Sequence, residues 1–502
     1  MNMKSKNAIL RLFALLMVVL MLSAAMVSCW KKDEKPEDSK QSSDISDIVD
    51  SGSDGDESTY VPTAIKEDFD GYVLTALTRS GTWESNDITA PVVGDVLSQA
   101  TYMRNATLEK KYNFKIREDK TSGFGEVASI QGSSGQHQYD LWSFNLNEAD
   151  NFAEQGYCYD LNSISGLNLE APYYDQSLNK QGSFAGKLFF TVGDMTYLDN
   201  LVTTCIVVNH GMWDELKLND KYGKSIYKMV DDGEWTFEVF TTVVKDARYD
   251  LDGNGIYDIT DRWGFNYVST RLLSFNIGFG NEFLTKDIDD VHMLNNSQKQ
   301  LDDVETIADV IGNRNPYVWF GGAYDGSNAF KEERQLLDET WVRDLIHLVK
   351  SSIDYGIVPH PKANEDQEEY YNYITCYATN HITIPVTVAK GDHLDTVANI
   401  IELTSYESKR VVSPQLESYI FDGRLYNHVE DRGMLELIFK NRKYELCHLW
   451  STGHIYTAVC NIAHSDYEVG STFKGLEDAV ATDVKARLEV IQKNADITDA
   501  SK

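Results

Sequence analysis

The first part of the globular chain alternates short apolar runs with one long amphipathic segment. The run at 72–77 is rich in residues that favour strands, and positions 92–112 repeat apolar residues at helical spacing. Strand-like runs return at 113–116 and 139–143. Strand, helix and strand in this order predict parallel α/β units, and the ligands of such folds gather beyond the carboxyl ends of the strands.

The rest of the chain is patterned mainly for helices. Buried strands are predicted at 187–192 and 204–209, and Thr236 is placed to cap a helix through Ala247. The stretch 323–341 contains no obvious strand. Three further helices are predicted in the later half, at 340–353, 394–409 and 431–442.

The N-terminal segment has the pattern of a secretory signal rather than of a fold. Basic residues precede a short apolar run at 12–22, which is shorter than the ~20 residues that a membrane-spanning helix needs. Ser28 and Cys29 follow in a stretch that resembles a bacterial lipobox, in which the cysteine becomes the lipidated first residue. An ordinary cleaved signal with a chance cysteine is the alternative. We expect a lipoprotein signal peptide at 1–28 and lipid on Cys29.

Residues 29–62 are polar and acidic and have almost no apolar side chains. Such a composition cannot bury enough surface to offset the chain entropy, so we expect a disordered tether behind the anchored cysteine. A merely frayed terminus is the alternative. The remaining residues, 63–502, are globular in composition and long enough for two lobes.

Charge and cysteine usage narrow the classes of function. The formal net charge of −32 repels phosphate backbones, which argues against nucleic-acid binding and against a mainly anionic ligand. The six cysteines are widely spaced and include no C-x-x-C pair, so a disulfide framework or a zinc ribbon has no support. Apart from Cys29, we expect most of them to be buried small hydrophobic residues.

The strongest motif lies at 250–261 and matches the calcium-loop pattern D-x-[DN]-x-[DN]-G. Gly255 permits the sharp turn, and the twelfth position holds an aspartate, whose arm is shorter than that of the usual Glu. The expected ligands, through side-chain oxygens, one carbonyl and one bridging water, are Asp250, Asp252, Asn254, Ile256, Asp258 and Asp261. A metal-free turn is the alternative. Because a strand follows the loop, we expect a structural Ca²⁺ rather than a sensor, with Trp235 and Trp263 packed around it.

Sequence motifs for the common catalytic sites are missing. No nucleophile elbow, zinc-protease, P-loop or dinucleotide-binding pattern is present. The 11 histidines are scattered, and single ones such as His137 or His381 are more typical of a surface or a core than of catalysis. The many carboxylates leave a paired-carboxylate glycosidase open, although nothing distinguishes two of them from a solvated acidic face. We expect no enzymatic activity.

Several segments, each weak alone, occur together along most of residues 70–450. They are RNATLEKKYN (104–113), YDLW (139–142), GYCYDL (156–161), GEWTF (233–237), the 250–261 loop followed by WGF (263–265), and GIVPHPK (356–362) followed by DQEEYY (366–371). In order and spacing they resemble the family 1 extracellular solute-binding proteins of carbohydrate ABC importers, above all the long lipoprotein members from anaerobic Gram-positive gut bacteria. Beside such relatives the stretch 323–341 looks trimmed, which would open or reshape the cleft.

The resemblance implies a type II periplasmic-binding-protein-like fold, in which two α/β lobes are joined by a hinge and hold the ligand between them. Lobe 1 would comprise 67–180 and 380–425, and lobe 2 would comprise 185–375 and 426–502. The resemblance also implies a lipid-anchored monomer on the extracellular face of the membrane. It would capture a carbohydrate, usually an oligosaccharide, and deliver it to the permease subunits of an ABC transporter.

Sugars present an apolar face and a rim of hydroxyls, so their sites combine aromatic platforms with polar side chains. The ligand-binding residues expected in loops near strand ends are Arg79, Trp83, Phe144, Asn145, Tyr197, Asp199, Trp319 and Tyr371. A role in the core is the alternative for each aromatic residue, since the chain has 28 Tyr and 9 Trp. Two rival functions are a binding protein for another solute, such as a peptide, and a surface glycan-processing enzyme.

Overall fold

The structure is a computed structural model that describes residues 61–62, 65–81, 84–145, 149–313, 315–319, 323–464 and 468–502. All of them belong to one compact unit, Gly52–Lys502. The predicted signal peptide, Cys29, nearly all of the tether and Trp83 lie outside the described residues. Within the described ranges, no helix combines the length and the apolarity that crossing a bilayer requires.

The first sheet joins the N-terminal strands with one strand that returns from much later in the chain, in the order β12-β3-β1-β2. β1 pairs in parallel with β2 and β3, and β12 runs antiparallel to β3. The strands predicted at 72–77, 113–116 and 139–143 are confirmed. The strands and the helices beside them are β1 (Tyr72–Arg79), β2 (Phe114–Thr121), β3 (Leu141–Phe144), β12 (His381–Thr383), α2 (Val96–Tyr112), α3 (Phe124–Ser134) and α15 (Asp392–Val411).

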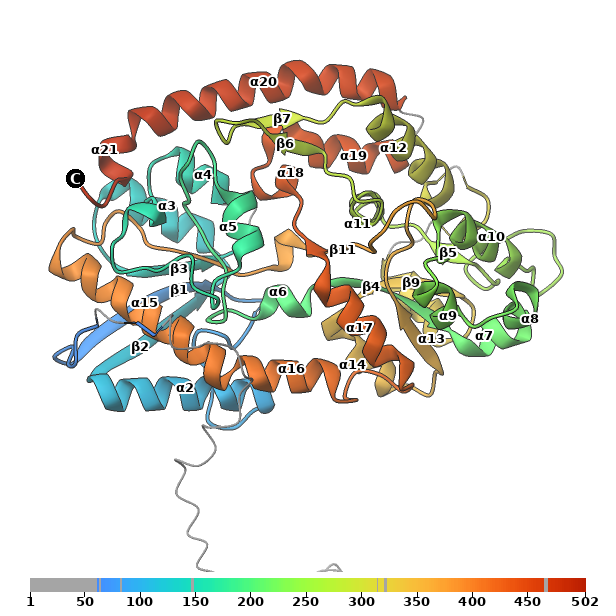
Figure 1. The fold of residues 1–502 in the computed structure, drawn as a ribbon, viewed down its shortest axis with the longest axis horizontal. Helices are drawn as coiled ribbons and strands as arrows, with labels where there is room; N and C mark the ends of the chain where they lie inside the picture. Colours follow the sequence, from blue (N-terminus) through green and yellow to red (C-terminus); the bar gives the residue numbers. More distant parts are fainter. Residues whose placement is uncertain are drawn as a thin grey trace, which may run out of the picture. The chain divides into compact units, whose positions relative to one another are not determined.

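Helix α2 has both of its ends fixed by local chemistry. The side chain of Asp95 accepts a hydrogen bond from the Ser98 N–H, which caps the helix start, and Asn113 takes a left-handed conformation (φ 52°) that ends it. α2 packs against α15 (Figure 1). Helices predicted at 92–112 and 394–409 are therefore confirmed, and the first begins later than predicted because Asp95 caps it.

Arg104, on α2, holds the loop after β1 in place. Its side chain is fully buried and donates to the carbonyls of Asp87 and Ile88 (both 2.9 Å) and to Ser408 Oγ on α15 (2.9 Å). Burial lowers the pKa of Arg104 to about 10, which still leaves it charged at neutral pH. A buried charge of this kind is tolerated only when its donors are satisfied, so the guanidinium ties three segments together.

The second sheet has β4 in its centre, in the order β10-β4-β9, and β4 is antiparallel to both neighbours. All six residues of β4 are buried. The strand predicted at 204–209 and the helices predicted after Thr236 and at 431–442 are confirmed, and the Thr236 side chain caps the Val239 N–H as expected. These elements are β4 (Thr204–Asn209), β9 (Leu337–Trp341), β10 (Tyr355–Val358), α10 (Phe237–Ala247) and α17 (Glu430–Lys440).

The strand predicted at 187–192 is wrong. This stretch is apolar and buried, but it forms only isolated bridges, including Thr191 with Ile382. Its backbone groups find other partners: the Leu188 N–H donates to Asp160 Oδ1 (3.1 Å), and the Phe189 carbonyl accepts from Thr383 Oγ1 (2.6 Å). A buried irregular segment of this kind has the same apolar pattern as a buried strand.

The region around 323–353 also differs from the prediction. Residues 323–341 were expected to lack a strand. They contain α13 and also β9, which is an edge strand of the second sheet and pairs with β4. The helix predicted at 340–353 is wrong over its first part, because 340–341 end β9 and a 3₁₀ turn follows before α14. Pairing with β4 supplies the partners that make 337–341 a strand, and no local pattern shows that pairing.

The remaining described elements are short ribbons and helices. The ribbons are β5 (Phe265–Asn266) with β8 (Val318–Trp319), β6 (Leu284–Lys286) with β7 (His292–Leu294), and β11 (Asn372–Tyr373) with β13 (Arg442–Lys443). The helices are α4 (Ala149–Glu154), α5 (Gln176–Gly182), α6 (Leu198–Leu201), α7 (His210–Glu215), α8 (Leu218–Tyr222), α9 (Ile226–Asp231), α11 (Arg271–Gly278), α12 (Gln298–Ile311), α13 (Ala323–Lys331), α14 (Leu345–Val349), α16 (Ser413–Phe421), α18 (Leu446–Leu449), α19 (Ile455–His464), α20 (Val469–Lys493) and α21 (Ala495–Thr498).

The long helix α20 packs against β7 and α12 and also against α4, which lies beside the first sheet (Figure 1). Arg487 on α20 is buried and donates to Glu154 on α4 (2.7 Å) and to the carbonyl of Trp450 (2.8 Å). The cysteines predicted to be buried hydrophobic residues are so at four positions and partly exposed at Cys460; the four are Cys158, Cys205, Cys376 and Cys447.

Candidate functional site

The segment 375–380, called the crossover segment below, leads from β11 into β12 and meets the loops that follow β1 and β3. Asn145, directly after β3, donates through Nδ2 to the carbonyl of Tyr377 (2.7 Å). Asn380 donates through Nδ2 to Ser85 Oγ (2.7 Å), in the loop after β1. The carboxyl ends of two parallel strands of the first sheet therefore lie against one stretch of chain.

The second sheet reaches the crossover segment through β9. This strand ends at Trp341, whose Nε1–H donates to Thr375 Oγ1 (2.8 Å). The ends of β1, β3 and β9 thus converge on the same segment. In open α/β sheets this edge is where ligands bind, because loops at the carboxyl ends of the strands are free to vary around a fixed scaffold.

A row of aromatic rings lines this place. The Trp341 and Tyr377 rings lie 6.0 Å apart, Tyr377 lies 5.5 Å from His448, and His448 stacks on Tyr456 at 4.3 Å. The Arg343 guanidinium lies 5.4 Å from the Trp341 ring. Trp341, Tyr377, Tyr456 and Arg343 are all partly exposed. The arrangement offers apolar ring faces beside a multivalent hydrogen-bond donor, a combination that suits a sugar.

The rings of this row stay uncharged near neutral pH. Burial lowers the pKa of His448 to about 4, and its Nδ1 lies 2.6 Å from the Tyr373 hydroxyl. Burial also raises the pKa of Tyr377 to about 12 and that of Tyr456 above its ordinary value. A ligand without charge therefore meets no titrating ring over the physiological range.

Two of the predicted ligand residues lie where the strands end. Asn145 is buried against the crossover segment, where its role is to hold Tyr377. Arg79 is the last residue of β1 and is partly exposed, and its side chain makes no hydrogen bond or ion pair with another described residue. A bound solute is free to accept from this guanidinium.

The structure corrects the expectation for two aromatic residues. Phe144 is 1% exposed and packs between Phe124 and Phe152, so it offers no free face. Tyr197 is 6% exposed within the same hydrophobic core, and burial raises its pKa. Both follow or end apolar runs near strand ends, but neighbouring helices cover their rings.

Asp199 lines a separate cavity of about 380 Å³ rather than the aromatic row. The cavity is also lined by Asp175, Asp194 and Glu417. Two cations partly balance them: Arg442 lies 3.8 Å from Asp199 and Lys409 lies 3.7 Å from Asp194. Burial raises the pKa of Asp199 to about 7 although Arg442 opposes the shift. This cavity is strongly acidic and has a different character from the aromatic row.

Trp319 and Tyr371 lie elsewhere. Trp319 belongs to β8 and its ring packs 5.5 Å from that of Trp263, beside the 250–261 loop. Tyr371 is partly exposed, with the Lys443 ammonium 4.2 Å from its ring. Neither contacts the crossover segment through a described hydrogen bond or ring pair.

The 250–261 loop has the internal bonding of a chelating loop. Asp250 accepts from the N–H groups of Gly253 (2.7 Å) and Gly255 (2.8 Å), and both glycines have positive φ. Asp261, almost fully buried, accepts from the Leu251 N–H (2.8 Å) and so closes the loop. Carboxylate oxygens of Asp250, Asp252 and Asp261 lie within 4.8 Å of one another. The residues present therefore fit a Ca²⁺ ion, which takes oxygen ligands at 2.3–2.6 Å.

Of the two tryptophans expected beside this loop, one is there. Trp263 donates through Nε1 to the carbonyl of Asp258 (2.8 Å) and packs on Tyr257. Trp235 is fully buried at a different place, where it donates to the carbonyl of Pro359 (2.9 Å). Its expected role at the loop is wrong, because the start of α10 carries it into the core.

No protein-family model and no curated protein matches the sequence. Solved structures do match. The ABC substrate-binding protein from Listeria monocytogenes, in complex with cycloalternan, is 12% identical, with 82% of this chain and 99% of that chain covered and a TM-score of 0.52. A family 1 extracellular solute-binding protein from Bifidobacterium longum subsp. infantis is 13% identical, with 82% of this chain and 99% of that chain covered and a TM-score of 0.52. The maltose/maltodextrin-binding domain from Bdellovibrio bacteriovorus, bound to maltotriose, is 13% identical, with 82% of this chain and 100% of that chain covered and a TM-score of 0.50.

This chain has the two-lobe solute-binding protein fold. Nearly the whole length of each of these structures is covered, so the likeness extends over both sheets and not over one α/β half. In this solute-binding fold the crossover segment is one of the places where the chain passes from the second sheet to the first. The aromatic row lies at this crossover segment and is the feature of the site that suits a ligand.

The sequence did not predict that the residues of the aromatic row would be part of a site in this solute-binding fold. Trp341 fell in a predicted helix, whereas it ends β9, and Tyr456 lies in the first turn of α19, far along the chain. Tyr377 and His448 gave no signal, because scattered aromatic residues are as common in cores as in sites. No apolar run marks 337–341 as a strand, because Asp338 and Glu339 precede Thr340 and Trp341.

Proposed function

We propose that this protein is the lipid-anchored, non-catalytic solute-binding component of an ABC importer and that it captures a carbohydrate on the aromatic row. The observation that carries the proposal is the convergence of three strand ends on the crossover segment, where the aromatic residues Trp341, Tyr377 and Tyr456 are partly exposed. The fold agrees with this role, and two structures that share it are described with cycloalternan and with maltotriose. An oligosaccharide is the ligand that a row of several rings suits.

The acidic cavity at Asp199 is a weaker place for a neutral sugar. Four carboxylates meet only two cationic side chains there, Lys409 and Arg442, so the lining keeps an excess of negative charge that a neutral sugar does not offset. On the aromatic row, the rings match the apolar face of a sugar and the Arg343 guanidinium offers donors to its hydroxyl groups. We therefore assign the carbohydrate to the aromatic row.

A panel of oligosaccharides and peptides tests the proposal. We expect the purified chain to show a ligand-dependent rise in melting temperature with at least one oligosaccharide and no product by chromatography after prolonged incubation. A shift with peptides alone would move the assignment to the rival class of binding protein. Release of cleaved sugar would instead identify a glycan-processing enzyme.

We also propose that lipid on Cys29 anchors the protein and keeps it beside its permease at high effective concentration. The support is the lipobox-like stretch and the polar residues that follow it. A Cys29→Ala variant is expected to bind sugar normally and to be released from cells into the medium. Cell fractionation checks this, and a variant that stays with the membrane fraction would contradict the anchor.

The 250–261 loop is proposed to hold a structural Ca²⁺. Removing the ion with EGTA should lower the melting temperature by about 3 °C, since a ligand at a hundredfold excess over its Kd stabilises by about 2.7 kcal/mol. Asp252→Asn keeps one acceptor for the Asn254 N–H and removes one charge, so the EGTA effect should become small. Asp478→Asn, an exposed aspartate on α20, is the matched control. An identical EGTA response in Asp252→Asn and in the unmodified chain would exclude the loop as the calcium site.

A further inference from the structure

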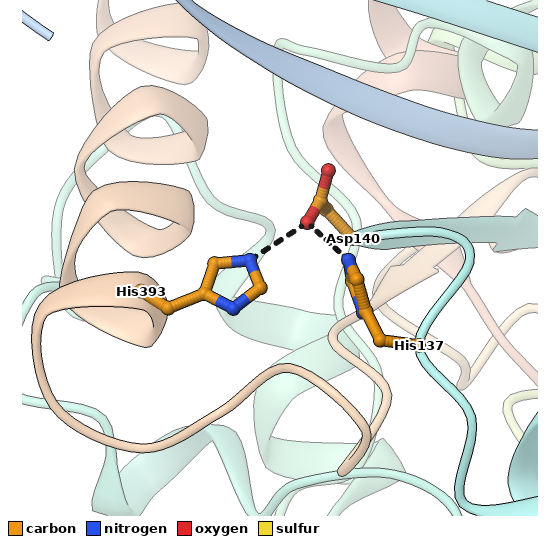
Figure 2. A group of neighbouring side chains, drawn as sticks. All are labelled: His137, Asp140 and His393. Atoms are coloured by element: carbon orange, nitrogen blue, oxygen red, sulfur yellow. Dashed lines mark hydrogen bonds and ion pairs between the residues drawn. The ribbon is translucent and has the colours of Figure 1, made fainter. Parts of the chain in front are cut away.

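Two histidines converge on one carboxylate oxygen in a cluster that the proposed function does not use. His137 Nε2 lies 3.2 Å and His393 Nε2 lies 3.1 Å from the same atom, Asp140 Oδ1 (Figure 2). Figure 2 shows both imidazole rings pointing their Nε2 atoms at this oxygen from opposite sides. The three ligand atoms all lie within 4.8 Å of one another.

The cluster is assembled from distant parts of the chain. Asp140 directly precedes β3, His137 lies in the turn after α3, and His393 is in the first turn of α15. Tyr72, the first residue of β1, also reaches the cluster. These positions are at the amino ends of β1 and β3, whereas the aromatic row lies at the carboxyl ends. The cluster is therefore a separate site.

The Asp140 carboxylate is held in one orientation. Its other oxygen, Oδ2, accepts from the Thr75 N–H (2.7 Å) and from Thr75 Oγ1 (2.9 Å), and its side chain is 2% exposed. Oδ1 is thereby fixed toward the two histidines. Outer hydrogen bonds that orient a ligating carboxylate are typical of metal sites.

The two nitrogen–oxygen distances suit neighbouring ligands of a tetrahedral ion. Metal–ligand distances of about 2.0–2.1 Å for zinc place neighbouring ligands about 3.3 Å apart around a tetrahedron, close to the two N–O distances of 3.1 and 3.2 Å. Two imidazole nitrogens with one carboxylate oxygen suit zinc and its neighbours better than calcium or magnesium. The histidine side chains are 34% and 28% exposed, so a water can take the fourth position.

We propose that His137, Asp140 and His393 bind a divalent transition-metal ion, with Zn²⁺ as the preferred ion. Because His393 and Asp140 are 253 positions apart in sequence, the ion would join the start of α15 to the starts of β1 and β3. It acts as a structural staple on the first sheet and leaves the aromatic row untouched.

Two neighbouring contacts define what zinc must replace. The Ala389 N–H lies 3.4 Å from His393 Nδ1, and ligation through Nε2 places a proton on Nδ1, so this long hydrogen bond is given up. The Tyr72 hydroxyl lies 2.7 Å from Asp140 Oδ1 and 2.9 Å from His393 Nε2. The Tyr72 hydroxyl donates to the carboxylate, and its contact with His393 Nε2 is the second one that the ion would replace.

Zinc titration of the full chain, purified without a polyhistidine tag and with Ca²⁺ in excess, tests the site. We expect one Zn²⁺ per chain by calorimetry, a rise in melting temperature of about 2–5 °C, and a tetrahedral visible spectrum with Co²⁺. His137→Gln and His393→Gln should each weaken zinc binding at least ~100-fold, since even outer-shell changes cost 10- to 100-fold. The Co²⁺ spectrum should be lost in both.

Matched variants make the result specific. His347→Gln changes an exposed histidine on α14 and should leave zinc binding unaltered. Tyr72→Phe keeps all three ligands and should bind zinc within about tenfold of the unmodified chain. Absence of zinc binding at micromolar concentration in a folded, unmodified chain overturns the proposal. So does zinc binding that persists unchanged in both His137→Gln and His393→Gln.

Discussion

Trp341→Ala is expected to weaken oligosaccharide binding about 30-fold, which corresponds to about 2 kcal/mol. Trp341 is the ring that ends β9, carries the Arg343 guanidinium on one side and lies 6.0 Å from Tyr377. Its removal deletes the largest aromatic surface of the row, and truncated central aromatic anchors typically cost this much. Calorimetric titration with the oligosaccharide that gives the largest thermal shift measures the loss.

The control for this variant is Tyr102→Ala, which removes another partly exposed ring, on α2. It should change sugar affinity less than twofold, and the melting temperatures of both unliganded variants show whether folding is intact. Unchanged sugar affinity in a folded Trp341→Ala protein would remove the aromatic row as the carbohydrate site. Because that result would leave zinc binding at Asp140 unaffected, the two proposals fail separately.

Stability is expected to fall as the pH rises toward 8, and Glu445 is the main reason. This carboxyl group is fully buried and accepts long hydrogen bonds from the N–H groups of Phe283 (3.3 Å) and Cys447 (3.3 Å), with the Cys447 thiol as a further partner. Burial raises its pKa from 4.5 to about 8, and the nearby Glu282 charge adds to the shift. The folded state therefore holds a proton that the unfolded chain releases.

The direction follows from that difference. Below about pH 4.5 Glu445 is protonated in both states and its stabilising contribution is complete, and the contribution is lost as the pH rises through 8. Across this window the loss is at most about 5 kcal/mol, from 1.36 kcal/mol per unit of pKa difference. Unfolding in urea at pH 5, 7 and 9 measures it.

Glu445→Gln should flatten this dependence, because the amide stays neutral and keeps an acceptor for one N–H group. We expect a variant close to the unmodified chain at pH 5 and more stable than it at pH 9. A smaller slope should remain, since burial also raises the pKa of Asp199 to about 7 and that of Asp431 to about 6. Glu489→Gln, at an exposed position on α20, is the control. A pH profile of Glu445→Gln that parallels the unmodified chain would contradict the assignment.

Local features of the fold were predictable from the sequence. The helix that ends at Tyr112 and the Thr236 cap were both confirmed, because each depends on residues that are neighbours in the chain. The strand predicted at 187–192 and the missing β9 were wrong for the opposite reason. Whether an apolar run becomes a strand depends on a partner strand, and the partner of β9 is β4, more than a hundred residues earlier.

For the candidate site, the order of strands and helices along the chain predicted the edge of the first sheet where the site lies, but not the residues that form it. Parallel α/β patterning pointed to the loops after β1 and β3, and Asn145 does meet the crossover segment there. Phe144, its neighbour, turned out to be a core residue because Phe124 and Phe152 cover it. Exposure of a ring is a property of the packed molecule. Phe144 therefore belongs to the core, whereas Asn145 beside it contacts the crossover segment.

The sequence by itself determined the α/β class, the negative net charge and the hydrogen-bonded aspartate- and glycine-rich loop at 250–261, since these follow from composition or from residues within one loop. Only the tertiary structure decided which side chains meet. It brought Trp341 to Tyr377 and His393 to Asp140, pairs that no local spacing connects. Sheet pairing and helix packing fix those meetings, because they depend on burial and hydrogen bonding across the whole chain.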